Sequence, residues 1–316
     1  MSDSSYTAMQ AAVDIVGRSP HPDNKIAATL TGDDFSLSAT NYWPAPIEEK
    51  IGRNIKIGSS SGTIHAETAC ILEASRRGIV TKSAQLFITD PPCPNCMKNM
   101  AEAGIKALYI DHKGFDKDFA QRRGHHFAHM SMKIAEHAGI GVYKLFRKEQ
   151  RIEPIFEAPE GYKPPEENPV IISRHGEETK RPTQHSTDIP FATCLTHNAK
   201  GERFRLHATA HPVTGYTTPV TDEPEDRYSF ILEPVTRLLM SAARQGFVIE
   251  PESFYAAQAP TARELVNLIG AGVTRIEIGN PAKCRDLSGL TALKQLKASG
   301  ILEIASTRKK FYPERD

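Results

Sequence analysis

Two short fragments of the chain combine metal-binding residues with a residue that can move protons. The first is His65-Ala66-Glu67, and the second is Pro92-Cys93-Pro94-Asn95-Cys96. One imidazole and two thiols supply three ligands of a catalytic zinc site, which keeps its fourth position open for water. A carboxylate beside such a site, here Glu67, can act as both base and acid. This set of groups is what a zinc-activated water needs to remove an amine from a nucleobase.

The surrounding pattern places both fragments at the starts of helices. Apolar periodicity and stop signals predict a helix over 64–78, a strand over 85–89 and a second helix over 94–103. Cys93 and Cys96 are three residues apart at the start of the second helix, so both face one direction. Helix N-termini favour anions and help to hold thiolates. We therefore expect two helix N-termini to meet at one zinc ion per chain.

Helices and strands alternate through this part of the chain. The other predicted elements are a helix at 8–17, a hairpin at 25–30 and 35–40, a strand at 107–110, a helix at 127–137 and a strand at 141–146. This order predicts an α/β fold with helices on both faces of a sheet. Residues 148–188 are rich in Pro and Glu and predict a partly extended linker; a long ordered segment packed on the first domain is the alternative.

The order of elements then repeats. Residues 64–110 align without a gap on residues 232–278 at a constant shift of 168, and ten of the 47 pairs are identical. The hairpins align too, with Thr29-Leu30-Thr31 on Cys194-Leu195-Thr196. The second set of predicted elements comprises strands at 190–195, 203–209, 253–257, 275–278 and 301–305, and helices at 232–246, 261–270 and 290–299. A duplicated fold follows, with domains over 1–147 and 189–316 and the linker over 148–188.

The second copy has lost the chemistry of the first. At the shift of 168, His65 and Glu67 are replaced by Glu233 and Val235, and the two cysteines by Thr261 and Glu264. Valine cannot shuttle protons, and scattered carboxylates make a poor zinc site. We expect a zinc-less domain that replaces the second subunit of a dimer and closes one side of the active pocket. A regulatory ligand in its vestigial pocket is the alternative.

With these motifs, residues ~5–147 resemble the zinc-dependent cytidine deaminase superfamily, in the branch of deoxycytidylate, tRNA-adenosine and guanine deaminases. The resemblance implies a three-layer α/β/α fold with a mixed central sheet. It implies that His65, Cys93 and Cys96 bind Zn²⁺ and that Glu67 shuttles protons. The helix before the last strand suits the branch whose final two strands run parallel, because parallel strands need a crossover.

The same resemblance suggests residues that bind substrate. Asn41, in Thr40-Asn41-Tyr42-Trp43-Pro44, would touch the base or sugar, the backbone of Ala66 would bind the base, and Trp43 could stack on it. A turn role for Asn41 and a packing role for Trp43 are the alternatives. Ala69 stands where deoxycytidylate deaminases usually carry an Asn, so a free base, a nucleoside and a nucleotide all stay open.

Other polar groups near the motifs have less specific roles. A phosphate could meet Arg53, Lys56 or the Gly58-Ser59-Ser60-Ser61-Gly62 loop, although such a loop is more often a flexible connection. His125, His126 and His129 lie near the site by topology.

Bulk composition narrows the choice of partners. The net charge is +1, so no overall basic field favours nucleic acid or a membrane surface. Five cysteines, an odd number in a long chain, are no disulfide framework and fit a reducing cytoplasm. No signal peptide or spanning apolar run is recognised.

The expected function is therefore hydrolytic deamination of a small molecule that contains a nucleobase, with a homodimer as a possible assembly. A tRNA-adenosine or guanine type of deaminase and a non-enzymatic zinc module are the alternatives. The intact Glu67 argues against the module, because a structural zinc site has no use for that carboxylate.

Overall fold

The computed structural model describes residues 3–176, 190–223 and 228–306, which form two mixed sheets with their helices. The elements of the first half are α1 (Asp3–Ile15), β1 (Ala27–Thr31), β2 (Ser36–Thr40), α2 (Ala45–Lys50), α3 (Ala66–Arg76), β3 (Gln85–Ile88), α4 (Pro94–Glu102), β4 (Ala107–Asp111), α5 (Asp118–His126), α6 (Met132–Ala138), β5 (Gly141–Phe146) and β6 (Arg151–Phe156). They form a sheet in the order β2-β1-β3-β4-β5-β6. β1 is antiparallel to β2 and β3, whereas β3, β4 and β5 run parallel, as expected.

The second sheet repeats this topology. Its elements are β7 (Ile171–Arg174), β8 (Phe191–His197), β9 (Arg203–Thr209), β10 (His211–Pro212), β11 (Ile231–Leu232), α7 (Pro234–Gln245), β12 (Val248–Ile249), β13 (Phe254–Gln258), α8 (Ala262–Gly270), β14 (Arg275–Asn280), α9 (Leu287–Ala298) and β15 (Glu303–Ser306). The order β9-β8-β13-β14-β15 has the same strand directions as β2-β1-β3-β4-β5. The predicted duplication is confirmed at the level of the sheet.

The register of the hairpins corrects one detail of the sequence alignment. Phe87 pairs with Thr29 in the first sheet, and Tyr255, its equivalent at the shift of 168, pairs with Thr193 in the second. Thr193 therefore occupies the place of Thr29, and the predicted match of Thr29 with Cys194 is wrong by one residue. A slip of one residue moves a side chain to the other face of a sheet, so motif similarity in a short strand cannot fix the register.

The layers are complete in the first half. Met9 of α1 packs with Phe87 and Tyr109 on one face of the sheet, whereas Leu86 and Ile88 face the main core. This is the predicted α/β/α arrangement. All three described helices of the second half, α7, α8 and α9, contribute to the main core, so within the described ranges none corresponds to α1.

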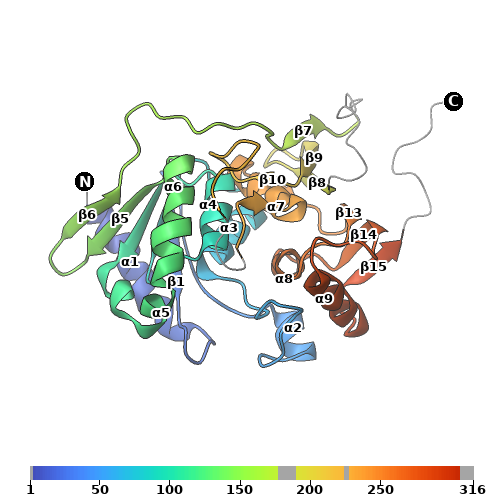
Figure 1. The fold of residues 1–316 in the computed structure, drawn as a ribbon, viewed down its shortest axis with the longest axis horizontal. Helices are drawn as coiled ribbons and strands as arrows, with labels where there is room; N and C mark the ends of the chain where they lie inside the picture. The colour runs from blue at the N-terminus through green and yellow to red at the C-terminus, as the bar shows by residue number, and fades with distance from the viewer. Residues whose placement is uncertain (1–2, 177–189, 224–227, 307–316) are drawn as a thin grey trace.

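The two halves pack through their helices. In Figure 1, α3, α4 and α7 lie together between the two sheets, and one continuous apolar core includes residues of both halves. Gly78 and Gly246, equivalent at the shift of 168, end α3 and α7 with φ of +66° and +67°. A Cβ on Gly246 would lie 3.0 Å from the carbonyl oxygen of Gly78. Equivalent residues that meet each other mark a pseudo-two-fold axis, as in the interface of a symmetric dimer.

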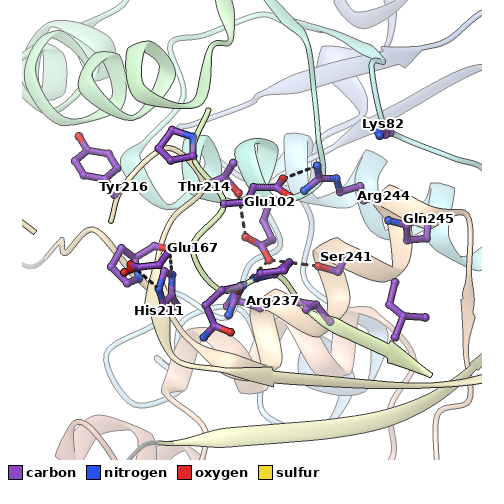
Figure 2. A pocket seen from close by; sticks show the side chains of 17 residues that line it. Lys82, Glu102, Glu167, His211, Thr214, Tyr216, Arg237, Ser241, Arg244 and Gln245 are labelled. Atoms are coloured by element: carbon purple, nitrogen blue, oxygen red, sulfur yellow. Dashed lines mark hydrogen bonds and ion pairs between the residues drawn. The ribbon is translucent and has the colours of Figure 1, made fainter. Parts of the chain in front are cut away.

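One corner of this seam carries buried charges. Nε of Arg237 on α7 lies 3.2 Å from Oε1 of Glu102 on α4, and the two side chains are 4% and 6% exposed. Hydroxyls of Ser241 and Thr214 also donate to Glu102, each at 3.3 Å (Figure 2). At the symmetry-related corner, Glu102 is replaced by Gly270, where a Cβ would meet Ile64. The Arg237–Glu102 ion pair thus has no counterpart at Gly270, whose carbonyl accepts a hydrogen bond from Arg76 instead.

The segment between the halves contains more structure than the predicted linker. β6 pairs with β5 and extends the first sheet beyond residue 147, and β7 pairs with β9 at the edge of the second sheet. The rest of the predicted linker from 177 lies outside the described residues. Among the described helices, none is both long enough and apolar enough to cross a membrane.

Candidate metal centre and substrate cavity

Three side chains of zinc-binding type meet where α3 and α4 begin. His65 precedes α3 and Cys93 precedes α4, both in extended conformation, and Cys96 lies in the first turn of α4. Nδ1 of His65 lies 3.2 Å from Sγ of Cys96 and 3.6 Å from Sγ of Cys93. The three ligand atoms all lie within 4.8 Å of one another. The sequence predicted this convergence of two helix N-termini.

The cluster has the dimensions of a single zinc site. Zn–S bonds of about 2.3 Å and Zn–N bonds of about 2.0–2.1 Å at tetrahedral angles separate nitrogen from sulfur by about 3.6 Å. The His65–Cys93 and His65–Cys96 distances lie close to this value. Hydrogen bonding from Cys96 and the nearby His65 lower the pKa of Cys93, which favours the thiolate that a metal requires.

Glu67 lies beside this cluster, in the first turn of α3, and is 3% exposed. Burial raises the pKa of Glu67 to about 7, against the opposing effect of His65. A carboxyl group with a pKa near neutrality exchanges protons readily in either direction. This pKa fits the predicted role of Glu67 as a general acid and base, and the role itself stays a prediction.

A cavity of about 170 Å³ opens at Glu67, His65 and Cys93. Asn41, predicted to bind substrate, also lines it. The Asn41 side chain is tightly held: Oδ1 accepts from Ser19 Oγ at 2.7 Å and from the backbone N–H of Ile26 at 3.0 Å, and Nδ2 donates to the Asn24 carbonyl at 2.9 Å. An amide carries two N–H donors, so this network leaves one N–H of Asn41 for a substrate.

Trp43 is not among the residues that line this cavity. The indole is 6% exposed, donates from Nε1 to the carbonyl of Ser61 at 3.2 Å, and stacks on His21 at 5.3 Å between ring centroids. His21 lines the cavity instead. Trp43 thus supports a cavity residue, and contact of its own with the substrate stays a prediction.

Several lining residues were missed from the sequence. Phe127 starts a π-helical turn (Phe127–Ser131) between α5 and α6, and Ser131 donates to the carbonyl of Pro92 at 3.1 Å. His126, which the sequence placed only near the site, lines the cavity, and its ring meets Tyr228 edge-on at 5.1 Å. Tyr228 belongs to the second half of the chain. No sequence motif marks these residues. In the structure, the π-helical turn is a local indication of a functional site, because such turns often occur there.

In the second half, a carboxylate fills the position of the metal centre. Glu264, the counterpart of Cys96, is 3% exposed, and its oxygens accept hydrogen bonds from the backbone N–H groups of Val235 and Thr236 and from the N–H and hydroxyl of Thr261. Glu264 thus caps α7 and α8 at once. Of the described residues, only His65, Cys93 and Cys96 form a metal-binding group of this kind.

Comparisons with known proteins agree with this geometry. Residues 2–111 match the family model of the cytidine and deoxycytidylate deaminase zinc-binding region. ComE operon protein 2 of Bacillus subtilis (strain 168) is 34% identical over 83 residues, 26% of this chain and 38% of that protein. A deoxycytidylate deaminase of Enterobacteria phage T2 is 46% identical over 50 residues, 16% of this chain and 27% of that enzyme.

The chain thus spans between about a quarter and two fifths of the length of these relatives. Among solved structures, the dCMP deaminase from cyanophage S-TIM5 in complex with dCMP and dUMP is similar at 20% identity, with a TM-score of 0.35 over 46% of this chain and 99% of that one. The family model and the ligand cluster coincide in the same segment of the first half. Residues 2–111 are a zinc-binding region of the cytidine and deoxycytidylate deaminase family.

Proposed function

We propose that the chain is a zinc-dependent hydrolase that removes the exocyclic amine from a cytosine-type base of a small molecule and releases ammonia. The observation that carries this proposal is the position of Glu67, buried beside three zinc-type ligands and lining a cavity. A structural zinc site would bury no acid of this kind. The relatives include an enzyme named deoxycytidylate deaminase, which supports a cytosine-type base.

In the proposed reaction, water adds to the ring carbon that bears the amine, and a carbonyl replaces the amine as ammonia leaves. Zinc held by His65, Cys93 and Cys96 would supply a Lewis acid that lowers the pKa of water to about 7. Glu67 takes a proton from the attacking water and passes it to the ring nitrogen. Glu67 then moves the remaining hydroxyl proton to the departing amine, so the carboxylate ends as it began.

The other residues of the cavity orient the base. The N–H of Ala66 is one of the groups that the first turn of α3 leaves without an intrahelical partner, so we assign it to the base. The remaining N–H of Asn41 would hold the base or sugar. His21, Phe127 and Tyr228 would form the walls, with Trp43 behind His21.

An ammonia-release screen tests this proposal. The zinc-loaded chain is offered cytosine, deoxycytidine, deoxycytidine monophosphate, guanine and tRNA. We expect release from a cytosine compound and a loss of at least about 100-fold in Glu67→Ala. The matched control is Glu73→Ala, which removes a half-exposed glutamate from the same helix. Release from tRNA or guanine alone, or full activity in Glu67→Ala, would contradict the proposal.

A homodimer and a cytoplasmic location stay predictions. We also propose that the zinc-less half replaces the second subunit of a dimer, on the basis of the pseudo-two-fold seam. Light scattering at working concentration measures the mass and decides whether one chain or two form the particle.

A further inference from the structure

Two buried polar side chains that the proposed reaction does not use lie next to the zinc-type ligands. Thr68 lies in the first turn of α3, directly after Glu67, and is 2% exposed. Asn99 lies three residues after Cys96 on α4 and is 5% exposed. Because residues three apart are neighbours on a helix surface, Asn99 lies on the side of α4 that carries Cys96. The two helices that bring the ligands together therefore also bring these polar groups together.

The two side chains form a line of contacts that ends at a ligand sulfur. Nδ2 of Asn99 donates to Oγ1 of Thr68 at 3.0 Å. Oγ1 of Thr68 lies 3.9 Å from Sγ of Cys96, and hydrogen bonds to sulfur are long because sulfur is a large atom. A threonine hydroxyl carries a single proton. Since the oxygen of Thr68 accepts from Asn99, this proton is available to the sulfur.

The sulfur of Cys96 needs such a donor. Cys96 is buried, and an anion buried without hydrogen bonds is strongly disfavoured. The other side chains in contact with this sulfur are His65, Cys93 and Glu67. In the zinc-loaded protein, two of these are ligands themselves and the third is the proposed proton carrier. The hydroxyl of Thr68 is then the side-chain donor that is left for the thiolate of Cys96.

The second half keeps both polar residues although it has lost the sulfur. Their counterparts at the shift of 168 are Thr236 and Asn267, and Glu264 takes the place of Cys96. Glu264 accepts from the backbone N–H of Thr236 at 3.3 Å. Nδ2 of Asn267 is buried and has no hydrogen-bond partner among the residues that the structure describes. A buried amide without a partner does not stabilise the fold, so this residue pair has an evident use only beside a metal centre.

We propose that Thr68 and Asn99 are positioning residues of the zinc centre, in which Asn99 orients the hydroxyl of Thr68 and this hydroxyl donates to the thiolate of Cys96. The hydrogen bond would hold the sulfur in its ligating position and offset part of its negative charge. Partners of this kind orient metal ligands, and their loss typically costs about 10- to 100-fold in metal affinity or activity. The inference concerns the metal centre and does not depend on which base is deaminated.

The test measures the zinc affinity of the full chain by competition with a chromophoric chelator at constant pH. Thr68→Val keeps the shape of the side chain and removes the hydroxyl, so the dissociation constant of zinc should rise about tenfold or more. Thr68→Ser keeps the hydroxyl and should stay close to the wild type. Asn99→Leu should weaken zinc binding as well. Combining it with Thr68→Val should add little, because both changes act on one hydrogen bond.

The second half supplies the matched controls. Thr236→Val and Asn267→Leu make the same changes at equivalent buried positions, and both should leave the affinity for zinc unchanged. Far-UV circular dichroism verifies that each variant is folded. An unchanged affinity in Thr68→Val, or an equal loss in Thr236→Val, would overturn the inference. If Thr68→Val does not fold, Asn99→Leu decides, and wild-type affinity in that variant would overturn the inference too.

Cobalt(II) in place of zinc gives a readout that a packing defect would not move. The charge-transfer absorption from thiolate to cobalt depends on the electron density at sulfur, which a hydrogen bond lowers. The band should therefore shift to longer wavelength in Thr68→Val and keep its position in Thr68→Ser and Thr236→Val. A wild-type spectrum in Thr68→Val would contradict the inference. Failure of the proposed function is seen separately, as absence of ammonia release from every cytosine compound by the wild-type chain.

Discussion

Replacing Arg237 by alanine is expected to destabilise both halves together. The change removes the charged partner of Glu102 at 3.2 Å and the hydrogen bond from Nη1 to the carbonyl of Thr209 at 2.9 Å. Glu102 would stay buried with only the hydroxyls of Ser241 and Thr214 as donors. Breaking a buried pair in this way costs about 3–5 kcal/mol, a large part of the 5–15 kcal/mol that typically stabilises a folded protein.

The only tryptophan makes this prediction specific. Trp43 is buried in the catalytic half, and Arg237 lies in the zinc-less half. One apolar core spans both halves, so we expect them to unfold together. In Arg237→Ala, the midpoint urea concentration of unfolding should therefore fall equally when it is followed by tryptophan emission and by far-UV circular dichroism. Arg275→Ala, an exposed pair of the same half, should cost at most about 1 kcal/mol.

The reasoning would be refuted by separate transitions. If tryptophan emission kept its wild-type midpoint while circular dichroism showed an earlier phase, the halves would unfold independently. A combined variant adds a second test: Arg237→Met with Glu102→Leu removes both charges and should recover much of the loss, because apolar replacement of a buried pair is often neutral.

Other predictions concern the sites themselves. Burial raises the pKa of Glu264 to about 7, so folding favours its protonated form. The free energy of unfolding should therefore fall as the pH rises from about 4.5 to 7, and it should fall less in Glu264→Gln. Urea titrations at several pH values measure this dependence. Glu264→Ala should cost about 2–4 kcal/mol at pH 5, because it removes the caps of α7 and α8, and no loss of stability would contradict this role. Asn41→Ala should lower stability by about 1–3 kcal/mol as well as activity, since its amide holds Ser19 and Ile26; an activity loss without destabilisation would mean that only substrate contact matters. Nζ of Lys98 donates to the carbonyls of Ser229 and Ile231, next to the cavity residue Tyr228, so Lys98→Met should release this wall and raise KM more than it lowers kcat; an unchanged KM would argue against such a tether.

The sequence was sufficient for the metal centre because its geometry is local. Each ligand lies at or next to the start of a helix, and helix periodicity determines which way neighbouring side chains point. The repeated frame likewise predicted the second sheet and the loss of its site. Both inferences depend on residues within one helix-strand-helix unit.

The walls of the site could not be predicted in this way. Tyr228 lies in the segment between β10 and α7, which has no periodic pattern, and its position depends on Lys98, which binds carbonyls more than 130 residues away in sequence. Lys98 itself is buried, and no sequence pattern distinguishes it from a lysine on the exposed face of a helix. β6 and β7 were missed for a related reason: each pairs with a strand already formed, so little in its own composition signals it.

The number of zinc ions per chain tests the central claim most directly. Metal analysis of the purified chain by mass spectrometry should give one zinc per chain, and Cys93→Ser should lose most of it while Glu264→Gln keeps it. Two zinc ions per chain, or one zinc that survives in Cys93→Ser, would contradict a single centre at His65, Cys93 and Cys96.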